Sequence, residues 1–571
     1  MTFADKIFLL RDFARDRCAL LESPLPACTL IFSVSDGDQR AETLHATGTS
    51  FDATWKEGLI RLRRRMDQRK LKGRFFRLDW VESAEEMAWT SFEQALVQSR
   101  RNYFRFGLAL DQKFSVLLTE QECNANALFY GDNQIDHAVF NPGNFKLYLE
   151  RRAPGFTFSH MPDQVWKIAV AGAFCDEEGA LFPLPGPEGQ GAKTGLETGH
   201  RPIPVLESDL LAQVIDRSSR WLARQVQPSG KYVYGYFPCF DRRIGTYNTL
   251  RHASSTYALL EAWEYTGNQE LEAPIGRAVD YLVKKCIRIY EPEPGHKAAF
   301  LVEGEAEEIK LGGNGVSLLA LVKWTELFGS QEHLPLMDLL AEGILRMRDP
   351  DTGGFVHVLS SADLSLKEKF RIIYYDGEAL FGLLRHYRLT GNERWLDAAA
   401  GVFDGFLDDQ HAEAHDHWLS YCVNELTRYR PEERYFRFGI RNFAGYLDFV
   451  LERETTFPTL LELMMAAQDM LERMANLPEL RHLLEGVDLE KFAKARDFRA
   501  RYLLNGYFWP EMAMFFKNPD RIRDSFFIRH HAFRTRIDDV EHYLSGLIAY
   551  ARMLERGTCD IMRGPGAAKP L

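Results

Sequence analysis

The sequence predicts a mainly α-helical fold: an (α/α)6 toroid of six helical hairpins, preceded by a smaller α+β domain. The first observation is a repeat, because Gly267, Gly329 and Gly391 each follow a long apolar helical pattern and are 62 residues apart in both cases. The second is that residues 206–556 read as helical almost throughout. Hairpins that repeat at a fixed period must stack, because one copy cannot bury its own apolar faces.

The N-terminal part has a different pattern, which predicts an α+β domain of unknown role over residues 1–185. Alternating or β-branched segments predict strands at 29–34, 75–81, 104–110 and 166–174. Helical spacing predicts helices at 3–22, 52–70, 84–99 and 118–129. The Gly- and Pro-rich segment 186–205 then reads as a linker. It is no phosphate loop, since Ala192 rather than glycine precedes Lys193.

Six pairs of helices are predicted after the linker, which is the number that closes a toroid. They are 208–225 with 247–265, 269–286 with 313–328, 332–348 with 376–389, 393–408 with 417–427, 432–452 with 458–475, and 489–504 with 538–550. The last residues, 557–571, are expected to form a flexible tail.

Composition excludes several classes of partner. The chain has 571 residues, 46% hydrophobic and 26% charged, which is ordinary for a soluble globular protein. Its net charge of −11 argues against nucleic-acid binding, and the basic run 61–74 reads as the solvated face of an amphipathic helix. The eight cysteines form no CxxC motif, and no segment resembles a signal peptide or a membrane span. We expect a cytoplasmic protein without membrane partners, and a homodimer stays open.

The stretch Tyr374–Leu380 places two tyrosines and two carboxylates at the start of an apolar helix. Asp376 and Glu378 are two residues apart, so on a helix their side chains point about 200° apart. They can form one acid–base pair only if Asp376 lies in the loop before the helix. We therefore prefer to pair one of them with Glu305, Asp416 or Asp539. A purely structural role, capping the helix start, is the alternative.

If the inner helices all begin at one rim, their first residues meet around one cavity. The catalytic candidates are Asp376, Glu378, His417, Asp538, Asp539 and His542. The substrate-binding candidates are Arg251, His252, Glu303, Glu305, Asn314, Tyr374, Tyr375, His415, Asp416 and Arg536. Sugar chemistry needs a proton donor, a proton acceptor and aromatic faces, and this set supplies all three.

Arg251 opens the first inner helix, where a cation opposes the helix dipole. It either recognises a substrate carboxylate, as on a uronic or sialic-type sugar, or forms a salt bridge to Asp376 or Asp539. His417, Tyr421 and Glu425 share one helix face, which is either a satisfied core network or part of a site.

Two groups of residues are candidates for a metal site. His542 shares a helix face with Asp538 and Asp539, and a second group is His411, His415 and His417. Because the sequence has no second ligand pair at a fixed spacing, we predict neither a metal nor a cofactor.

The period, the hairpins and the polar helix starts resemble the (α/α)6-barrel carbohydrate enzymes, over the C-terminal three-fifths of the chain. These include N-acylglucosamine 2-epimerase-like proteins, unsaturated glucuronyl hydrolases and glucuronyl C5-epimerases. The resemblance implies an intracellular hydrolase, epimerase or lyase acting on a small or oligomeric, possibly acidic, sugar. The alternative is a toroid of another kind: a terpenoid-type or lanthionine-synthetase-type cyclase or transferase, or a peptide-binding scaffold. Cys239, Cys286 and Cys422 lack the motif of a lanthionine-type zinc set.

Overall fold

The chain forms two compact units. A computed structural model describes residues 2–187, 197–304, 306–407 and 410–557. The first unit comprises Met1–Pro204, Gly235–Ile244 and Asn505–Thr535, and the second comprises Val205–Tyr234, Gly245–Leu504 and Arg536–Leu571. Two segments of the predicted helical domain therefore belong to the first unit by their contacts. Residues 188–196 of the predicted Gly-rich linker and nearly all of the predicted tail lie outside the described residues.

The first unit is built on a seven-stranded antiparallel sheet. Its strands are β1 (Cys28–Ser35), β2 (Glu42–Gly48), β3 (Phe75–Ala88), β4 (Gly107–Ala109), β5 (Leu117–Leu118), β6 (Gln164–Cys175) and β7 (Leu181–Leu184). They follow the order β2-β1-β3-β6-β4-β5, with β7 paired to β6. The predicted strands at 29–34, 75–81 and 166–174 are confirmed. The predicted helix 84–99 is wrong at its start, because β3 continues to Ala88 and α3 (Trp89–Val97) begins after it.

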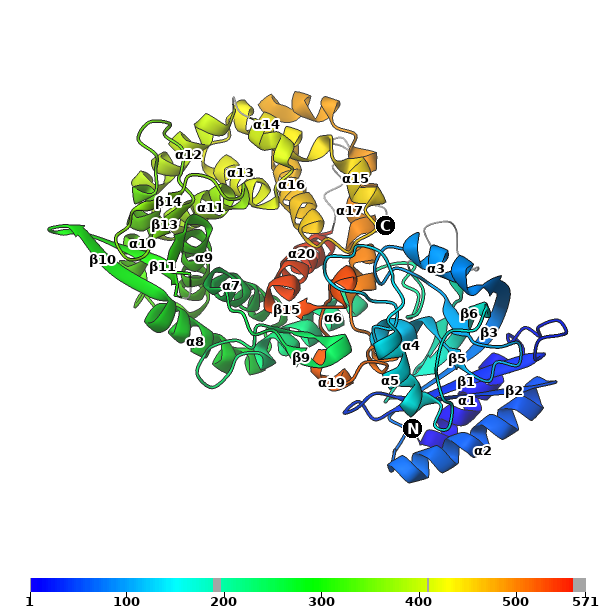
Figure 1. The fold of residues 1–571 in the computed structure, drawn as a ribbon. Helices are drawn as coiled ribbons and strands as arrows, with labels where there is room; N and C mark the ends of the chain where they lie inside the picture. Colours follow the sequence, from blue (N-terminus) through cyan, green and yellow to red (C-terminus); the bar gives the residue numbers. More distant parts are fainter. Residues whose placement is uncertain (1, 188–196, 305, 408–409, 558–571) are drawn as a thin grey trace. The chain divides into compact units, whose positions relative to one another are not determined.

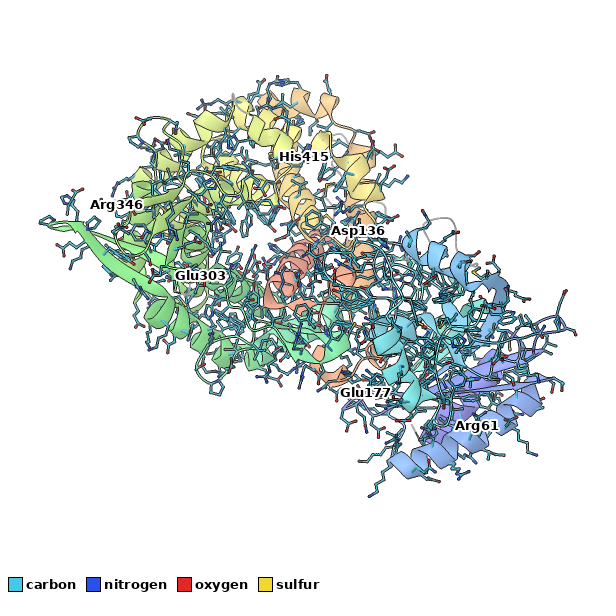
Figure 2. All side chains as sticks on the ribbon, viewed as in Figure 1. Arg61, Asp136, Glu177, Glu303, Arg346 and His415 are labelled. Carbon is cyan, nitrogen blue, oxygen red and sulfur yellow. The ribbon has the colours of Figure 1, made fainter. Side chains whose placement is uncertain are left out.

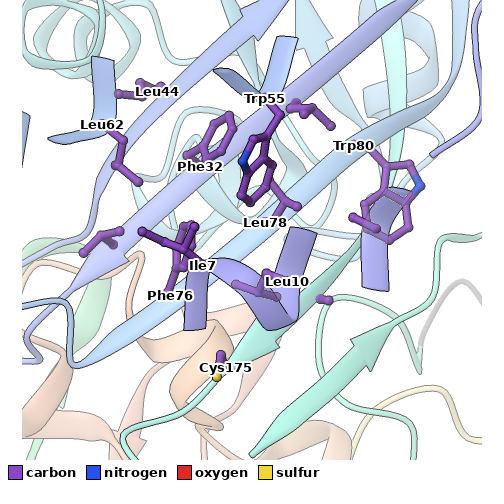
Figure 3. Close-up of a cluster of buried hydrophobic side chains, with 14 of the residues drawn as sticks. Ile7, Leu10, Phe32, Leu44, Trp55, Leu62, Phe76, Leu78, Trp80 and Cys175 are labelled. Atoms are coloured by element: carbon purple, nitrogen blue, oxygen red, sulfur yellow. The ribbon is translucent and has the colours of Figure 1, made fainter. Parts of the chain in front are cut away.

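Two helices cover one face of this sheet and form its main core with it (Figure 3). Ile7 and Leu10 of α1 (Phe3–Arg15) are buried in the same cluster as Trp55 and Leu62 of α2 (Phe51–Arg69). Phe32 packs against Trp55 from the central strand β1, with ring centroids 5.4 Å apart. The other helices of the unit are α4 (Glu120–Ala125), α5 (Pro142–Arg152), α18 (Pro510–Ala513) and α19 (Pro519–Ile522).

The second unit is a ring of helical hairpins (Figure 1). Its inner helices are α7 (Thr249–Thr266), α9 (Leu311–Phe328), α11 (Tyr374–Thr390), α13 (His417–Tyr429), α16 (Thr459–Ala475) and α20 (Ile537–Arg556). Its outer helices are α6 (Ser208–Arg224), α8 (Glu272–Tyr281), α10 (Leu334–Arg346), α12 (Glu393–Leu407), α14 (Glu433–Ala444) with α15 (Leu447–Glu452), and α17 (Leu489–Tyr502). Each inner helix packs against the next and α20 packs against α7, so the ring closes. A helix overlaps each of the twelve predicted helical spans.

Glycines end three of the inner helices, as the repeat predicted. Gly267, Gly329 and Gly391 have φ angles of 63°, 68° and 67°, the left-handed conformation that favours glycine. Each donates its N–H to a carbonyl four residues back, which satisfies a free group of the last turn. None of the helices in the described ranges is both long enough and apolar enough to cross a membrane.

Between α8 and α11 the chain also forms a small sheet, in a region where the sequence predicted helices almost throughout. Its strands are β10 (Ile287–Glu293), β11 (His296–Glu303), β12 (Glu308–Lys310), β13 (Val358–Ser360) and β14 (Leu366–Glu368). They form a five-stranded antiparallel sheet in chain order. The sheet leads directly into the starts of α9 and α11, and so helps to position the residues there.

Candidate functional site

Polar residues from the first half of five inner helices form one group, which we call the N-terminal cluster. Its members are Arg251, Glu378, Asp416, His417, Glu462, Asp538, Glu541 and His542. The Arg251 guanidinium lies 2.7 Å from Asp538, which joins α7 to α20. His542 Nδ1 lies 2.8 Å from Glu462 Oε2, which joins α20 to α16, and the His417 ring lies 5.3 Å from the His542 ring. The helix starts therefore meet, as the toroid requires.

Two arginines hold the carboxylates of α20. Asp538 accepts ion pairs from Arg251 at 2.7 Å and from Arg536 at 2.8 Å, and Asp539 pairs with Arg536 at 2.7 Å. Arg251 also lies 3.8 Å from Glu541. Arg251 thus forms a salt bridge, the second of its two predicted roles, but to carboxylates other than Asp376 or Asp539.

Glu378 is the most perturbed acid of α11. Its side chain is 1% exposed, and Oε2 has no hydrogen-bond partner among the residues that the structure describes. Burial raises the pKa of Glu378 to about 8, while Arg251 opposes the rise and neighbouring aspartates add to it. Gly312 of α9 leaves the space that the carboxyl fills, since a Cβ there would lie 1.7 Å from Oε2. Glu378 therefore holds a proton near neutral pH.

Asp376 lies inside α11, so the condition for pairing it with Glu378 in one site is not met. Its Oδ2 lies 3.1 Å from Nε2 of the buried His357. His357 Nδ1 accepts the backbone N–H of Arg371 at 3.0 Å, so the ring proton is on Nε2 and is donated to Asp376. Asp376 thus anchors the loop that leads into α11, together with a histidine that sequence reasoning missed.

Asp416 and His417 lie at the start of α13. Asp416 is the N-cap, and its Oδ2 accepts the N–H of Leu419 at 2.8 Å. Its Oδ1 lies 3.2 Å from His417 Nδ1. His417 is 2% exposed, and within the described ranges its Nε2 has no hydrogen-bond partner. The Tyr374 ring stands edge-on to the His417 ring, at a centroid distance of 5.3 Å.

Glu462 and Glu541 belong to the cluster but were not predicted. Burial raises the pKa of each to about 8. Glu462 Oε1 accepts the Tyr421 hydroxyl at 3.2 Å, and Glu541 Oε2 accepts the Ser255 hydroxyl at 2.9 Å. Burial also lowers the pKa of His542. Glu462 had a signal in the sequence, because it is the one charged residue in the apolar run 459–467.

Three predicted substrate-binding residues are held by the scaffold and lie outside the cluster. His252 is fully buried, accepts the Tyr247 hydroxyl at 2.7 Å and donates to the Ala278 carbonyl at 2.9 Å, and burial lowers its pKa to about 4. Asn314 is fully buried, and its oxygen accepts the N–H of Leu301 at 2.7 Å. Glu303 accepts the N–H of Thr249 at 3.0 Å and so caps α7.

Two further predicted residues lie at helix starts, Tyr375 in the first turn of α11 and His415 just before α13. Tyr375 packs 5.5 Å from the His357 ring, and burial raises its pKa to about 12. His415 stacks on Tyr446 at 4.2 Å and bonds to the Asn442 carbonyl at 2.9 Å. Figure 2 labels His415 and Glu303 on separate segments of the helical unit. Glu305 lies outside the described residues.

The second halves of the inner helices line a different hollow, which we call the C-terminal cavity. It has a volume of about 290 Å³ and is lined by Glu425, Arg385, Arg388 and Arg428, among others. Glu425 accepts the Tyr429 hydroxyl at 2.7 Å and lies 3.4 Å from Arg428, 3.9 Å from Arg385 and 4.0 Å from Arg388. The face of α13 that carries His417, Tyr421 and Glu425 therefore extends from the N-terminal cluster to the C-terminal cavity.

No family model matches the chain, and no curated protein matches it either. Among solved structures it is similar to a D-mannose isomerase, with 10% identity, 62% of this chain and 100% of that chain covered, and a TM-score of 0.46. A sugar epimerase from a ruminal bacterium matches with 12% identity, 62% and 100% coverage and a TM-score of 0.47. An unsaturated glucuronyl hydrolase specific for heparin matches with 12% identity, 61% and 99% coverage and a TM-score of 0.44. The matches fall on (α/α)6-barrel proteins, the group named from the sequence.

Proposed function

We propose that this chain is a carbohydrate-processing enzyme that works by acid–base catalysis in the N-terminal cluster. Glu378 donates a proton and Asp416 accepts one. The observation that carries the proposal is Glu378, a buried carboxyl group with a free oxygen and a pKa raised to about 8. A protonated carboxyl beside an ionised one is the pair that glycoside hydrolysis requires.

Asp416 is the partner that the packing favours. The starts of α11 and α13 are in close contact, because a Cβ on Gly377 would lie 2.6 Å from the Trp418 carbonyl carbon. Asp416 is also among the charges that raise the pKa of Glu378. Its Oδ1 has no hydrogen-bond partner in the described part of the chain, whereas Asp538 is held by two arginines. Asp416 is therefore the carboxylate with an oxygen available to a substrate.

The substrate class follows from the resemblance of the sequence to sugar enzymes and from the charge of the cluster. The proteins whose structures this chain resembles are also named as sugar enzymes. The cluster holds five carboxyl groups and one arginine, and that arginine already pairs with Asp538. Because Glu378, Glu462 and Glu541 hold protons near neutral pH, the charge that a carboxylate on the substrate would meet is that of Asp416, which repels it. We therefore assign a neutral or amino sugar, and not the acidic sugar considered from the sequence.

A second reaction, epimerisation or isomerisation, is favoured by the two histidines. The His417 and His542 rings are 5.3 Å apart and nearly perpendicular, at 77°. A pair of imidazoles can remove and return a proton at a sugar carbon. In this reaction the carbon-bound hydrogen exchanges with water, and in hydrolysis it does not.

The test uses the full-length protein with 4-nitrophenyl glycosides and free reducing sugars of neutral, amino and uronic type, followed by NMR in D2O. We expect turnover of neutral or amino sugars and little of uronic ones. Nitrophenol release without deuterium at carbon assigns hydrolysis, and deuterium incorporation assigns epimerisation.

Variants then test the assigned residues. Glu378→Gln and Asp416→Asn should each lower kcat by roughly 100-fold or more, while Glu378→Gln leaves the unfolding midpoint no lower than that of the unmodified protein. The matched control is Glu342→Gln on α10, whose carboxylate pairs with Arg394 at 2.8 Å outside the cluster. Full activity of a folded Glu378→Gln variant, or no turnover of any sugar by the unmodified protein, would reject the proposal.

A further inference from the structure

Three residues of the N-terminal cluster come from three different inner helices and converge on one point. His417 of α13, Glu462 of α16 and His542 of α20 each offer a ligand atom, and these atoms all lie within 4.8 Å of one another. We propose that this trio binds a divalent transition-metal ion. The inference goes beyond the proposed function, because a metal can bind there whether or not the chain processes sugars.

The first argument is the free nitrogen of His417. The side chain is 2% exposed, and Nε2 is buried without a hydrogen-bond partner among the described residues. A buried polar atom without a hydrogen bond lowers the stability of the fold, so its presence needs an explanation. Nδ1 lies 3.2 Å from Asp416 Oδ1 without the geometry of a hydrogen bond, and the nearby carboxylate favours the proton on Nδ1 electrostatically, which leaves the Nε2 lone pair available. A carboxylate behind a metal-binding histidine is the usual arrangement.

The other two ligands have supporting partners of the same kind. Glu462 faces His542 Nδ1 with Oε2, at 2.8 Å, and accepts the Tyr421 hydroxyl with Oε1, at 3.2 Å. The opposite nitrogen of His542 lies 3.6 Å from Glu541 Oε1. Glu462 is therefore oriented by a hydrogen bond, and each histidine has a carboxyl oxygen near its second nitrogen, at 3.2 Å for His417 and 3.6 Å for His542.

The donor set indicates the class of ion. Two imidazoles and one carboxylate bind zinc and other first-row transition ions and leave coordination positions open, whereas calcium and magnesium prefer oxygen ligands alone. Bonds of about 2.1 Å in a tetrahedron would bring the ligand atoms to about 3.4 Å from one another, which needs only small side-chain movements. The nearby carboxylate of Asp416 favours a cation electrostatically.

A competing group shares one of the ligands. Asp538, Glu541 and His542 also place one atom each within 4.8 Å of one another. Asp538 is already paired with Arg251 and Arg536, whose charges repel a cation. The histidine group 411, 415 and 417 weighed from the sequence is not favoured, because His415 is stacked on Tyr446 and bonded to a backbone carbonyl.

The experiment measures metal binding to the full-length protein without any sugar. The protein is stripped with a chelator and titrated with Co²⁺ and with Zn²⁺, and three properties are recorded: bound metal by mass spectrometry, visible Co²⁺ absorption, and the shift in unfolding temperature. The ligand variants are His417→Asn, Glu462→Gln and His542→Asn. The control is Asp338→Asn, which removes the carboxylate of another histidine contact, His386 Nε2 to Asp338 Oδ1 at 2.8 Å.

We expect one equivalent of metal per chain, with the Co²⁺ spectrum of a low-coordinate nitrogen and oxygen site. Each ligand variant should bind at least about tenfold more weakly, Asp416→Asn about 10- to 100-fold more weakly, and Asp338→Asn like the unmodified protein. Circular dichroism identifies the variants that fold without metal, and those decide the result. A folded unmodified protein that takes up no Co²⁺, or ligand variants that keep full affinity, would overturn the proposal. Because no substrate is used, that failure leaves the catalytic proposal standing, and loss of the catalytic proposal leaves the metal result intact.

Discussion

A buried glutamate lies at each end of the inner helices, and the two glutamates differ in the charges that surround them. In the C-terminal cavity, Glu425 is 3% exposed and lies among a tyrosine hydroxyl and three arginines. In the N-terminal cluster, Glu378 is 1% exposed, has a free oxygen and a pKa raised to about 8. Burial is the same at both ends, and the counter-charge differs. An acid buried without a counter-charge costs stability, and this cost is the reason why we propose the N-terminal end as the place for chemistry.

The basic residues of the ring also differ between the two ends of the inner helices. The C-terminal cavity is lined by Lys323, Arg385, Arg388, Arg428, Arg552 and Arg556. Several of them are paired there, for example Lys323 with Glu264 at 2.7 Å and Arg556 with Asp469 at 2.9 Å. The carboxylates at this end are therefore neutralised by the fold itself. We read the C-terminal cavity as an ion-paired part of the scaffold.

The largest expected effect concerns Glu378 and pH. The pKa of its carboxyl is raised from 4.5 to about 8, so between these values the folded state holds a proton that the unfolded state has lost. The free energy of unfolding should therefore fall as pH rises through this window. The Glu378→Gln variant has no carboxyl group to titrate and so does not lose this free energy. The difference in the free energy of unfolding, variant minus unmodified protein, should therefore increase by about 3 kcal/mol between about pH 5 and about pH 8. Urea denaturation at both pH values measures the difference. A difference that does not change with pH would contradict the assignment.

A smaller effect of the opposite kind is expected at Glu425. Glu425→Gln leaves Arg385 with Glu326, at 3.6 Å, as its remaining ion-pair partner and should lower the free energy of unfolding by about 1–2 kcal/mol. Arg388 and Arg428 are 41% and 43% exposed and can turn to water, which limits the loss. Denaturation at neutral pH measures it, with Glu378→Gln as the comparison that should lose nothing. Equal stability of the two variants would remove the contrast between the ends of the ring.

The smallest effect is expected from one methyl group at Gly312. In Gly312→Ala the new Cβ would lie 1.7 Å from Glu378 Oε2 and displace the carboxyl. Activity should fall by about 10- to 100-fold, because catalysis depends on the position of the donor. Stability should fall by about 1–2 kcal/mol, because the Cβ also lies 2.6 Å from the Tyr375 ring and the helix preference of alanine, about 1 kcal/mol, offsets only part of this overpacking. The control is Gly276→Ala on α8, where a Cβ would meet only Trp324, at 3.9 Å. Unchanged activity in Gly312→Ala would argue against Glu378.

The helical framework could be predicted because its signals are local. An apolar helical period and a terminal glycine specify a helix and its end, and the predicted span 208–225 matches α6 (Ser208–Arg224). The β10–β11 hairpin was missed, because short strands give weak patterns inside a long helical context. Helix 84–99 was misplaced for a related reason, since only pairing with β6 keeps residues 84–88 extended.

The candidate site could be predicted only as far as the helix starts. The convergence of the helix starts brings Glu378, His417, Asp538 and His542 together. Residues next to these in the sequence do not all point into the same group. Arg251 and His252 are neighbours, yet one step on a helix turns the side chain by about 100°. Arg251 therefore reaches Asp538, and His252 reaches the Ala278 carbonyl of α8. Glu462 was missed because its role depends on His542, a contact between helices that no local pattern records.

The contact between Arg251 and Asp538 ties the first inner helix to the last. During synthesis, α20 is the final inner helix to leave the ribosome, so the nascent chain carries Arg251 long before its partner exists. His542 and Glu541 arrive equally late. The ring can therefore close, and its site can assemble, only after α20 has been synthesised. A chain that stops before residue 537 would lack one side of the site altogether.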